Sequence, residues 1–135
     1  MVKICSKCKL ELPIESFHKH PNGAKGLRPR CIECVREQNN SASGKYSSYK
    51  ADAKRRGLNW ELTKNKFCEL WEANCFYCGD EHTFGIDRVD NSIGYYDNNV
   101  VSCCSTCNYA KGTMSSEVFL KMIEKIFKNT AMVRR

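Results

Sequence analysis

The hydrophobic pattern first takes on a helical period at residues 46–56 of the 135-residue chain. Tyr46, Tyr49 and Ala53 recur on one side of this stretch, and lysine and arginine fill the other side. Gly57 follows, and glycine is a residue that commonly ends helices. The pattern predicts an amphipathic helix that exposes a basic face.

A second helix is predicted over residues 64–73. Thr63 is suited to cap its N-terminus, because its hydroxyl can accept a hydrogen bond from a backbone N–H of the first turn. Phe67, Leu70 and Trp71 recur at helical spacing, so we expect them to face the core.

The last helix is predicted to begin at Ser115 or Ser116 and to continue to about Lys128. Its apolar side chains recur at i, i+3, i+4, i+7 and i+8, at Phe119, Met122, Ile123, Ile126 and Phe127. A stripe of this kind is more often part of a core than a dimer seam. We therefore expect it to be buried, with the dimer seam as the alternative.

Two further segments complete the organisation. Residues 37–45 are small and polar, which indicates a linker or an exposed turn. This places an N-terminal module at 1–44 and a second part at 45–135. Residues 75–112 are expected to form short strands followed by a helix. The predicted fold class is α+β.

Ten cysteines are far above ordinary usage for a chain of this length. Eight of them form four CxxC pairs, in which two intervening residues let both sulfur atoms face one ion. The first two pairs are separated by 22 residues and the last two by 25. We expect two structural zinc sites: Cys5, Cys8, Cys31 and Cys34 in the first, and Cys75, Cys78, Cys104 and Cys107 in the second.

Four thiolates leave a zinc ion no open position for water, so these sites are expected to stabilise the fold rather than catalyse. Cys68 and Cys103 remain, and Cys103 competes with Cys104 as a ligand. Met1 is followed at once by the first motif, without an apolar leader. No apolar run approaches the roughly 18 residues of a membrane span. We expect a cytoplasmic protein that does not contact a membrane.

The formal charge of +7 is unevenly distributed. Residues 1–60 hold 13 Lys and Arg against 5 Asp and Glu, a net +8, whereas residues 61–135 hold 9 against 10, a net −1. Clustered positive charge favours a polyanionic partner. The residues expected to contact the DNA backbone are Lys25, Arg28, Arg30, Lys50, Lys54, Arg55 and Arg56.

The segment from Gly85 to Gly112 carries the candidate chemistry. Its strand, loop, strand and helix place Asp87 and Asn108 where they could face each other across one hard cation. A divalent ion neutralises the charge that develops on a phosphodiester and its leaving oxygen, and Arg88 or Lys111 could hold the phosphate. The alternative is a surface Asp–Arg pair and an asparagine that closes a knuckle turn.

This segment resembles the HNH, or ββα-metal, nuclease family, in the zinc-bearing branch found among bacteriophage and restriction enzymes. The resemblance rests on Asp87-Arg88-Val89-Asp90, Gly94-Tyr95, Asn99-Val100 and Cys104-x₂-Cys107-Asn108-x₂-Lys111. It implies that Asp87 and Asn108 bind one catalytic Mg²⁺ or Mn²⁺. It also implies that Asn99 orients the loop by hydrogen bonds and that Lys111 lies near the phosphate.

The sequence departs from the family pattern at Arg88, which stands where the family has its first histidine, the general base. Arginine keeps its proton in proteins, so Arg88 is expected to stabilise transition-state charge instead. Tyr95 is the first candidate for the base, followed by His82 and Tyr96. A metal-bound water that needs no protein base is the alternative.

The resulting hypothesis is a metal-dependent endonuclease that hydrolyses double-stranded DNA, with one divalent metal per active site. A double-strand cut would favour a homodimer on a symmetric site, and a monomer would nick one strand. One alternative is a catalytically inactive zinc-ribbon protein that binds DNA. The other is an RNA-binding zinc ribbon, although the aromatic side chains that would stack on bases are not clearly grouped.

Overall fold

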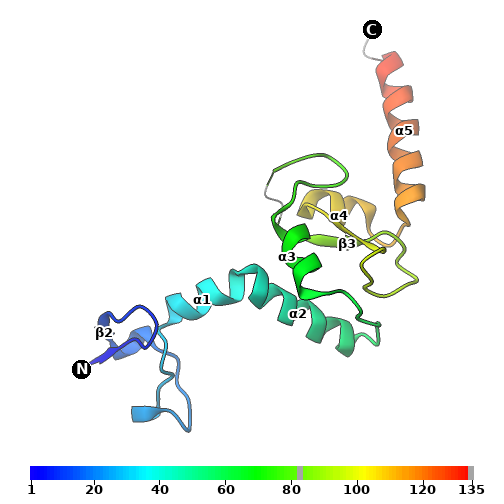
Figure 1. Ribbon diagram of the computed structural model, residues 1–135. Coiled ribbons are helices and arrows are strands. Elements are labelled where there is room, and N and C mark those ends of the chain that lie inside the picture. Colours follow the sequence, from blue (N-terminus) through cyan, green and yellow to red (C-terminus); the bar gives the residue numbers. More distant parts are fainter. Residues whose placement is uncertain (82–83, 134–135) are drawn as a thin grey trace. The chain divides into compact units, whose positions relative to one another are not determined.

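The computed structural model describes residues 1–81 and 84–133, and it confirms an α+β fold. The chain forms two compact units, Met1–Lys45 and Tyr46–Arg135. Among the described residues, no helix is both long and apolar enough to cross a membrane. In chain order the elements in Figure 1 are β1 (Val2–Ile4), β2 (Glu11–Pro13), α1 (Ile32–Asn40), α2 (Ala42–Arg55), α3 (Lys64–Glu72), β3 (Ile86–Arg88), β4 (Val100–Ser102), α4 (Ser105–Lys111) and α5 (Ser116–Val133), with 3₁₀ turns at Ile14–Ser16 and Ala24–Gly26.

The first unit is organised around the antiparallel β1–β2 hairpin, in which Lys3 lies opposite Leu12. Its buried core is Cys5, Phe17, Cys31 and Cys34, with Leu12 and Leu27 packed against it. Three of these four buried residues are cysteines, so hydrophobic contacts between larger side chains contribute little to the stability of this unit. A small domain of this kind depends on a further stabilising element such as a metal.

The predicted linker over residues 37–45 is wrong. Most of it is helical, because α1 continues to Asn40 and α2 begins at Ala42. Ser41 alone has extended backbone between them, and its Oγ accepts a hydrogen bond from the Gly44 N–H at 3.1 Å. Serine is favoured at the N-cap of a helix. A segment with the composition of a linker can therefore be helical on both sides of such a serine.

The second unit begins with the predicted basic helix and a second helix that packs near it. Thr63 caps α3 as expected, since its Oγ1 accepts a hydrogen bond from the Lys66 N–H at 3.3 Å. Phe67 and Trp71 are buried, with 0% and 6% of their surface exposed. Edge-on, tilted and stacked ring contacts join five aromatic side chains: Tyr46, Tyr49, Trp60, Phe67 and Trp71.

A ββα arrangement follows, as predicted. Strands β3 and β4 pair in antiparallel register, with Asp87 opposite Val101, and α4 begins three residues after β4. Ile86 and Val100 are buried and anchor the two strands to the core. This short unit presents the residues of the candidate site.

The expectation that the apolar stripe of α5 is buried is wrong. Phe119 is buried, but Met122, Ile123, Ile126 and Phe127 are 36%, 44%, 50% and 70% exposed. The helix leaves the rest of the second unit after its first turns (Figure 1). Helical spacing identified the stripe correctly, but spacing does not show what covers it.

Candidate active site

The first four-cysteine cluster lies in the core of the first unit. Its ligand atoms, from Cys5, Cys8, Cys31 and Cys34, lie within 4.8 Å of one another. The Cys5 and Cys34 sulfur atoms are 3.8 Å apart. Zn–S bonds of about 2.3 Å in a tetrahedron place neighbouring sulfur atoms about 3.8 Å apart. The donor set and its spacing therefore fit a zinc ion.

The second cluster, in the second unit, repeats this design with Cys75, Cys78, Cys104 and Cys107. The sulfur atoms of Cys78 and Cys104 are 3.7 Å apart. The third cysteine of each cluster is the N-cap of a helix that carries the fourth, Cys31 for α1 and Cys104 for α4. Cys104, not Cys103, belongs to this cluster, since the buried Cys103 is outside it.

Both clusters open with the same backbone turn. The N–H of Lys9 donates to the Cys5 carbonyl at 3.0 Å, and the N–H of Gly79 donates to the Cys75 carbonyl at 2.9 Å. The residue after the second cysteine has positive φ in each case, 63° at Lys9 and 79° at Gly79. Glycine adopts this left-handed conformation without strain at Gly79, and Lys9 adopts it at a steric cost that glycine avoids.

Backbone N–H groups favour the thiolate at the first cysteine of each cluster. Burial raises the pKa of Cys5, but hydrogen bonds from backbone N–H groups, that of Cys31 foremost, outweigh it and lower the pKa to about 6. Burial likewise raises the pKa of Cys75, and backbone N–H groups, that of Cys78 foremost, lower it to about 6. Thiolates are the form that binds zinc.

Asp87, at the centre of β3, is buried and held by two neighbouring side chains. Its side chain is 5% exposed, and Oδ2 lies 3.2 Å from Nζ of Lys111 on α4. The Tyr77 hydroxyl donates to the same oxygen at 2.8 Å. Burial raises the pKa of Tyr77, so its hydroxyl remains a donor to Asp87. The carboxylate is thus fixed by two donors.

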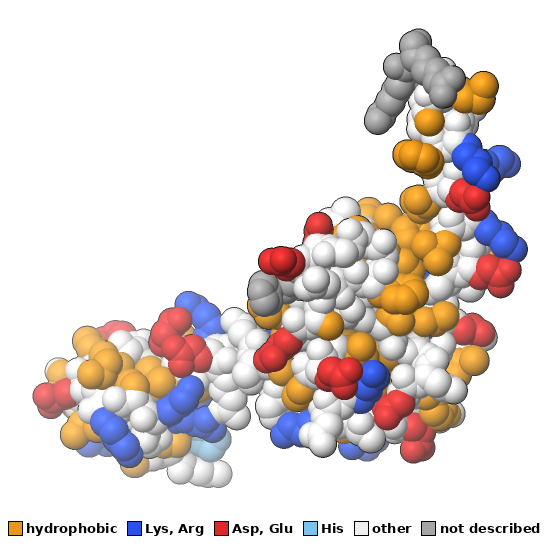
Figure 2. Space-filling view, turned by 45° about the horizontal axis from the view of Figure 1, so that its top comes forward, with side chains coloured by type: hydrophobic (Ala, Val, Ile, Leu, Met, Phe, Trp, Pro, Cys, Tyr) orange, Lys and Arg blue, Asp and Glu red, His pale blue; other side chains and the backbone are white. Residues whose placement is uncertain are grey.

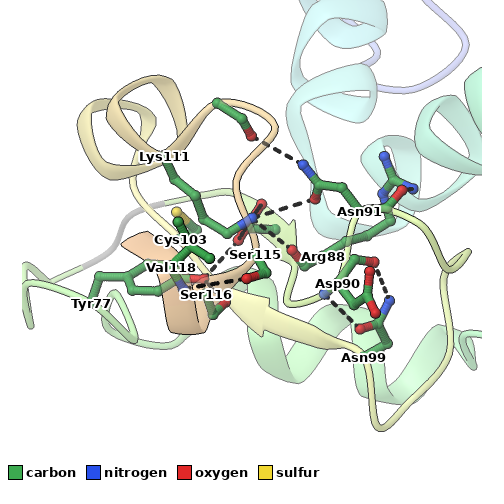
Figure 3. Close-up of polar contacts among 12 residues, drawn as sticks. Tyr77, Arg88, Asp90, Asn91, Asn99, Cys103, Lys111, Ser115, Ser116 and Val118 are labelled. Atoms are coloured by element: carbon green, nitrogen blue, oxygen red, sulfur yellow. Dashed lines mark hydrogen bonds and ion pairs between the residues drawn. The ribbon is translucent and has the colours of Figure 1, made fainter. Parts of the chain in front are cut away.

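The side chain of Lys111, which the family resemblance implies lies near the phosphate, is fully buried. Its ammonium donates to the backbone oxygen of Arg88 at 2.9 Å and to Oδ1 of Asn91 at 3.4 Å, in addition to Asp87 (Figure 3). These acceptors direct it inward. Through these hydrogen bonds Lys111 connects α4 to β3 and to the loop between β3 and β4.

Asn99 also holds the loop between β3 and β4, which spans residues 89–99. Its Oδ1 accepts the Asp90 N–H at 2.9 Å, and its Nδ2 donates to the Asp90 backbone oxygen at 3.0 Å (Figure 3). The same Nδ2 donates to the Gly94 backbone oxygen at 3.0 Å. Asn99 is 6% exposed. One amide side chain therefore holds both ends of the 90–94 segment of this loop.

Arg88 lies at the other end of the same loop. Its NH1 donates to the backbone oxygens of Asn91 and Ile93, each at 2.9 Å. Its guanidinium carbon is 5.4 Å from the centre of the Tyr95 ring. Tyr95 is buried and packs on Trp60, with ring centroids 4.8 Å apart. The cation is therefore held in place by the loop and by an aromatic face.

A cavity of about 730 Å³ brings the candidate residues together. Asp87 and Asn108 both line it, one from β3 and one from α4. Arg88 and Tyr95 line it as well, together with Ser48, Tyr49, Asp52, Arg56, Ile86, Asn91, Ser92, Gly112 and Thr113. Asn99 and Lys111 are not among the lining residues. Of the other base candidates, Tyr96 is half-buried outside the lining, and His82 lies outside the described residues.

The residues expected to contact DNA fall in both units. Lys25, Arg28 and Arg30 belong to the first, and Lys50, Lys54, Arg55 and Arg56 to the second. All of them are exposed except Arg30, which is half-buried. Asp52 forms ion pairs with Arg55 and Arg56 and offsets part of the positive charge beside the cavity.

Sequence reasoning missed three polar residues around Asp87. Tyr77 also bonds to Ser116 Oγ, and Asn91 donates through Nδ2 to the Gly112 carbonyl at 3.1 Å. Tyr77 lies between Cys75 and Cys78 in the first CxxC pair of the second cluster. Its position inside a CxxC pair was the signal in the sequence that could have drawn attention to Tyr77. The contacts of Ser116 and Asn91 depend on the tertiary fold.

Comparison with known proteins gives two likenesses. No family model matches the chain. It is 42% identical over 121 residues to the uncharacterized protein R423 of Acanthamoeba polyphaga mimivirus, over 86% of this chain and 21% of that protein. The chain thus spans about a fifth of the length of that relative. Among solved structures it is similar to the rare-cutting HNH restriction endonuclease PacI, with 24% identity, a TM-score of 0.46 and coverage of 93% of this chain and 94% of PacI. Neither likeness assigns an activity to this chain.

Proposed function

We propose that the protein is a metal-dependent DNA endonuclease of the HNH type. The observation that carries the proposal is that Asp87 and Asn108 line one cavity although twenty residues separate them in the sequence. A carboxylate and an amide carbonyl are hard oxygen donors, the kind that Mg²⁺ and Mn²⁺ prefer. A divalent ion at this place would neutralise charge on the phosphate and on the leaving oxygen.

Asp87 is prepared for such a role by its surroundings. Tyr77 and Lys111 fix the carboxylate by hydrogen bonds to its oxygens. Asn108 is exposed on α4, so it can turn toward a ligand in the cavity. A rigid carboxylate beside an accessible amide suits a site that takes only one or two protein ligands.

Arg88 supplies the fixed positive charge of the proposed site. Because arginine does not release its proton in proteins, we assign it to stabilising the transition state rather than to proton abstraction. The bonds to Asn91 and Ile93 hold the guanidinium beside the cavity before substrate binds. A cation held in advance needs no reorganisation during the reaction. Tyr95 lines the same cavity and remains our candidate for the proton acceptor.

Basic residues of both units are proposed to bind the DNA backbone. Each phosphate contact releases about one counterion, so six contacts would give a log–log salt slope of about −5. Arg56 lines the cavity, so it is the member of the set placed to bind near the scissile phosphate. Such contacts position the protein without reading sequence.

The two cysteine clusters are proposed to hold structural zinc. The second cluster is part of the candidate site, because Cys104 caps α4 and α4 carries Asn108. Zinc bound there would fix the start of the helix that presents one of the two metal ligands. A structural zinc site contributes on the order of 10 kcal/mol to folding.

The alternative is an inactive protein that binds DNA through the same basic surface. The observation that favours it is that Arg88 already donates to two backbone carbonyls, so these donors are engaged within the protein before any substrate binds. This protein would bind DNA with the same salt dependence and would not cut it.

Cleavage of supercoiled plasmid separates these functions. The zinc-loaded chain is assayed with Mg²⁺, with Mn²⁺, with Ca²⁺ and without added divalent ion, since EDTA would also remove zinc. We expect nicked or linear product with Mg²⁺ or Mn²⁺ only, and its loss in Asn108→Ala. Asn98→Ala is the matched control, because Asn98 is exposed and lies outside the cavity lining. DNA binding without cleavage under every condition would support the inactive protein.

A further inference from the structure

A second cavity, of about 650 Å³, lies on the side of α2 opposite the cavity of the candidate active site. Tyr46, Lys50 and Lys54 line it from one side of the helix. Asp52 and Arg56, on the other side of the helix, line the first cavity. A cavity of this volume can hold a molecule of the size of a nucleotide.

The second cavity is closed by the chain that turns back after α2. The N–H of Leu58 donates to the Ala53 carbonyl at 2.8 Å, and the N–H of Gly57 donates to the Lys54 carbonyl at 3.1 Å. Gly57 has a φ of 71°, the left-handed conformation of a glycine that ends a helix in a Schellman motif. Residues 57–60 therefore form a wall that faces the side chains of the helix.

This wall is fixed by backbone hydrogen bonds on both sides of Trp60. The N–H of Tyr95 donates to the Asn59 carbonyl at 2.8 Å, and the N–H of Glu61 donates to the Tyr95 carbonyl at 2.7 Å. Trp60 is thus held in place before any ligand binds, and a preorganised wall lowers the cost of binding.

The fold brings two aromatic side chains together in the second cavity. Tyr46 and Trp60, fourteen positions apart, both line it, and their ring centroids are 5.5 Å apart. The indole N–H of Trp60 donates to the Tyr46 hydroxyl at 3.4 Å. Both rings are half-buried, so each retains surface that a ligand can contact. Aromatic rings of this kind stack on nucleobases.

The charge of the second cavity is positive. Lys50 and Lys54 are exposed at its edge, and among the described residues that line it none is acidic. Figure 2 shows acidic and basic side chains mixed over one face of the second unit, so this lining differs from the surface around it. The Nζ atom of Lys50 lies 5.9 Å from the centre of the Tyr46 ring. The lining therefore suits an anion that also carries a flat aromatic group.

We propose that the second cavity is a subsite for one unpaired nucleotide of a DNA strand. The base stacks on Trp60, and Lys50 and Lys54 bind the phosphates on either side of it. The exposed amide of Asn59, which lines the same cavity, offers a donor and an acceptor to the edge of the base. One nucleotide thereby complements both the aromatic and the basic part of the lining.

The position of this subsite suits the strand that the candidate active site would cut. Tyr95 lines the first cavity, Trp60 lines the second, and their ring centroids are 4.8 Å apart. A strand whose scissile phosphate lies beside Tyr95 can therefore place a neighbouring nucleotide on Trp60. The proposal deepens the proposed function and rests on it for the choice of DNA as ligand, but binding at the subsite does not require cleavage.

Equilibrium binding without added divalent ion tests the subsite. The zinc-loaded chain is titrated with octathymidylate, and tryptophan fluorescence is followed. We expect quenching, because a base stacks on Trp60. An abasic strand with the same number of phosphates should bind about tenfold more weakly or worse, since it lacks the stacking group. Equal affinity for the two strands, or no quenching by octathymidylate, would overturn the proposal.

Substitutions at exposed positions test the lining without unfolding the chain. Asn59→Ala and Lys54→Ala should each weaken octathymidylate binding by about threefold or more, since each removes one polar contact. Asn65→Ala and Lys64→Ala are the matched controls, because both positions are exposed on α3 and lie outside the lining. The controls should retain the affinity of the wild type. Equal affinities in a variant and its control would overturn the proposal.

Thymidine 5′-monophosphate tests whether the same chemistry belongs to a free nucleotide. We expect it to bind about tenfold more weakly than octathymidylate or worse, because it offers only one phosphate to the two lysines. Equal affinity would overturn the assignment to a strand. Plasmid cleavage is measured separately. Lost cleavage with intact octathymidylate binding contradicts the nuclease proposal alone, and intact cleavage with equal binding of the abasic strand contradicts the subsite alone.

Discussion

The Nζ atom of Lys111 lies 3.2 Å from Oδ2 of Asp87, and the two side chains are 0% and 5% exposed. This buried ion pair joins the last residue of α4 to the middle of β3. The same ammonium bonds to the Arg88 carbonyl at 2.9 Å. Lys111 therefore positions the site from within, and Asp87 depends on it for a buried positive partner.

Removal of the Lys111 charge should destabilise the protein strongly. Lys111→Met leaves the buried Asp87 carboxylate without its ion-pair partner, which costs about 3–5 kcal/mol. Lys128→Met is the control, because Lys128 is 72% exposed and its pair with Glu124 is worth about 0.5 kcal/mol or less. Urea unfolding of the zinc-loaded variants measures both. Similar losses of unfolding free energy in the two variants would contradict the stabilising ion pair assigned to Lys111.

Asn99→Asp should loosen the loop between the strands. The new carboxylate can still accept the Asp90 N–H, but it cannot donate to the Asp90 and Gly94 carbonyls, which Asn99 now contacts at 3.0 Å. We expect a loss of roughly 2–4 kcal/mol in the free energy of unfolding. Asn98→Asp, at an exposed position, should change it by about 0.5 kcal/mol or less. Comparable values for the two variants would contradict this role of Asn99.

Lys9 and Gly79 each follow the first CxxC pair of a cluster, and substitutions at these two positions should change the free energy of unfolding in opposite directions. Lys9 has a φ of 63°, so Lys9→Gly should relieve strain and raise the free energy of unfolding by about 1 kcal/mol. Gly79→Ala should lower it by about 1 kcal/mol, through strain alone, because an added Cβ would meet no atom within 4 Å. Denaturant titration of the zinc-loaded proteins gives both values. Stabilisation by Gly79→Ala would contradict the shared turn geometry.

The features fixed by short-range chemistry could be predicted from the sequence. The four CxxC pairs and the Thr63 cap each depend on a few neighbouring residues, and the structure confirms the two clusters and the cap. Gly79 follows the same rule, since its conformation depends on the turn that contains it. Helical spacing likewise located α3 to within one residue at its end.

The features that depend on distant contacts could not be predicted. Lys111 has the helical position of a phosphate-binding residue, but three acceptors from β3 and the loop hold it inside. The CxxC spacing shows where Tyr77 lies in the chain, but its contact with Asp87 depends on how that turn meets β3 in the fold. The stripe that includes Phe127 has the period of a core helix, and nothing local shows that the rest of the second unit leaves Phe127 exposed.

Zinc content should follow the two clusters independently. Mass spectrometry should find two zinc ions per chain, and Cys34→Ser or Cys107→Ser should each reduce the number to one. Both tryptophans, Trp60 and Trp71, lie in the second unit, so their fluorescence reports on that unit alone. We expect the emission spectrum to be unchanged in Cys34→Ser and shifted in Cys107→Ser. Loss of both ions from either variant would contradict two separate sites.

Titration of the zinc-loaded chain with Mn²⁺, followed by electron paramagnetic resonance, tests most directly whether Asp87 and Asn108 share one hard cation. We predict one Mn²⁺ per chain, bound by the wild type and by Asn98→Ala, with binding lost or weakened at least tenfold in Asn108→Ala. Asn108 is exposed, so its removal should leave the fold intact. Equal Mn²⁺ affinity in Asn108→Ala and the wild type, or no Mn²⁺ bound by the wild type, would contradict the shared metal site.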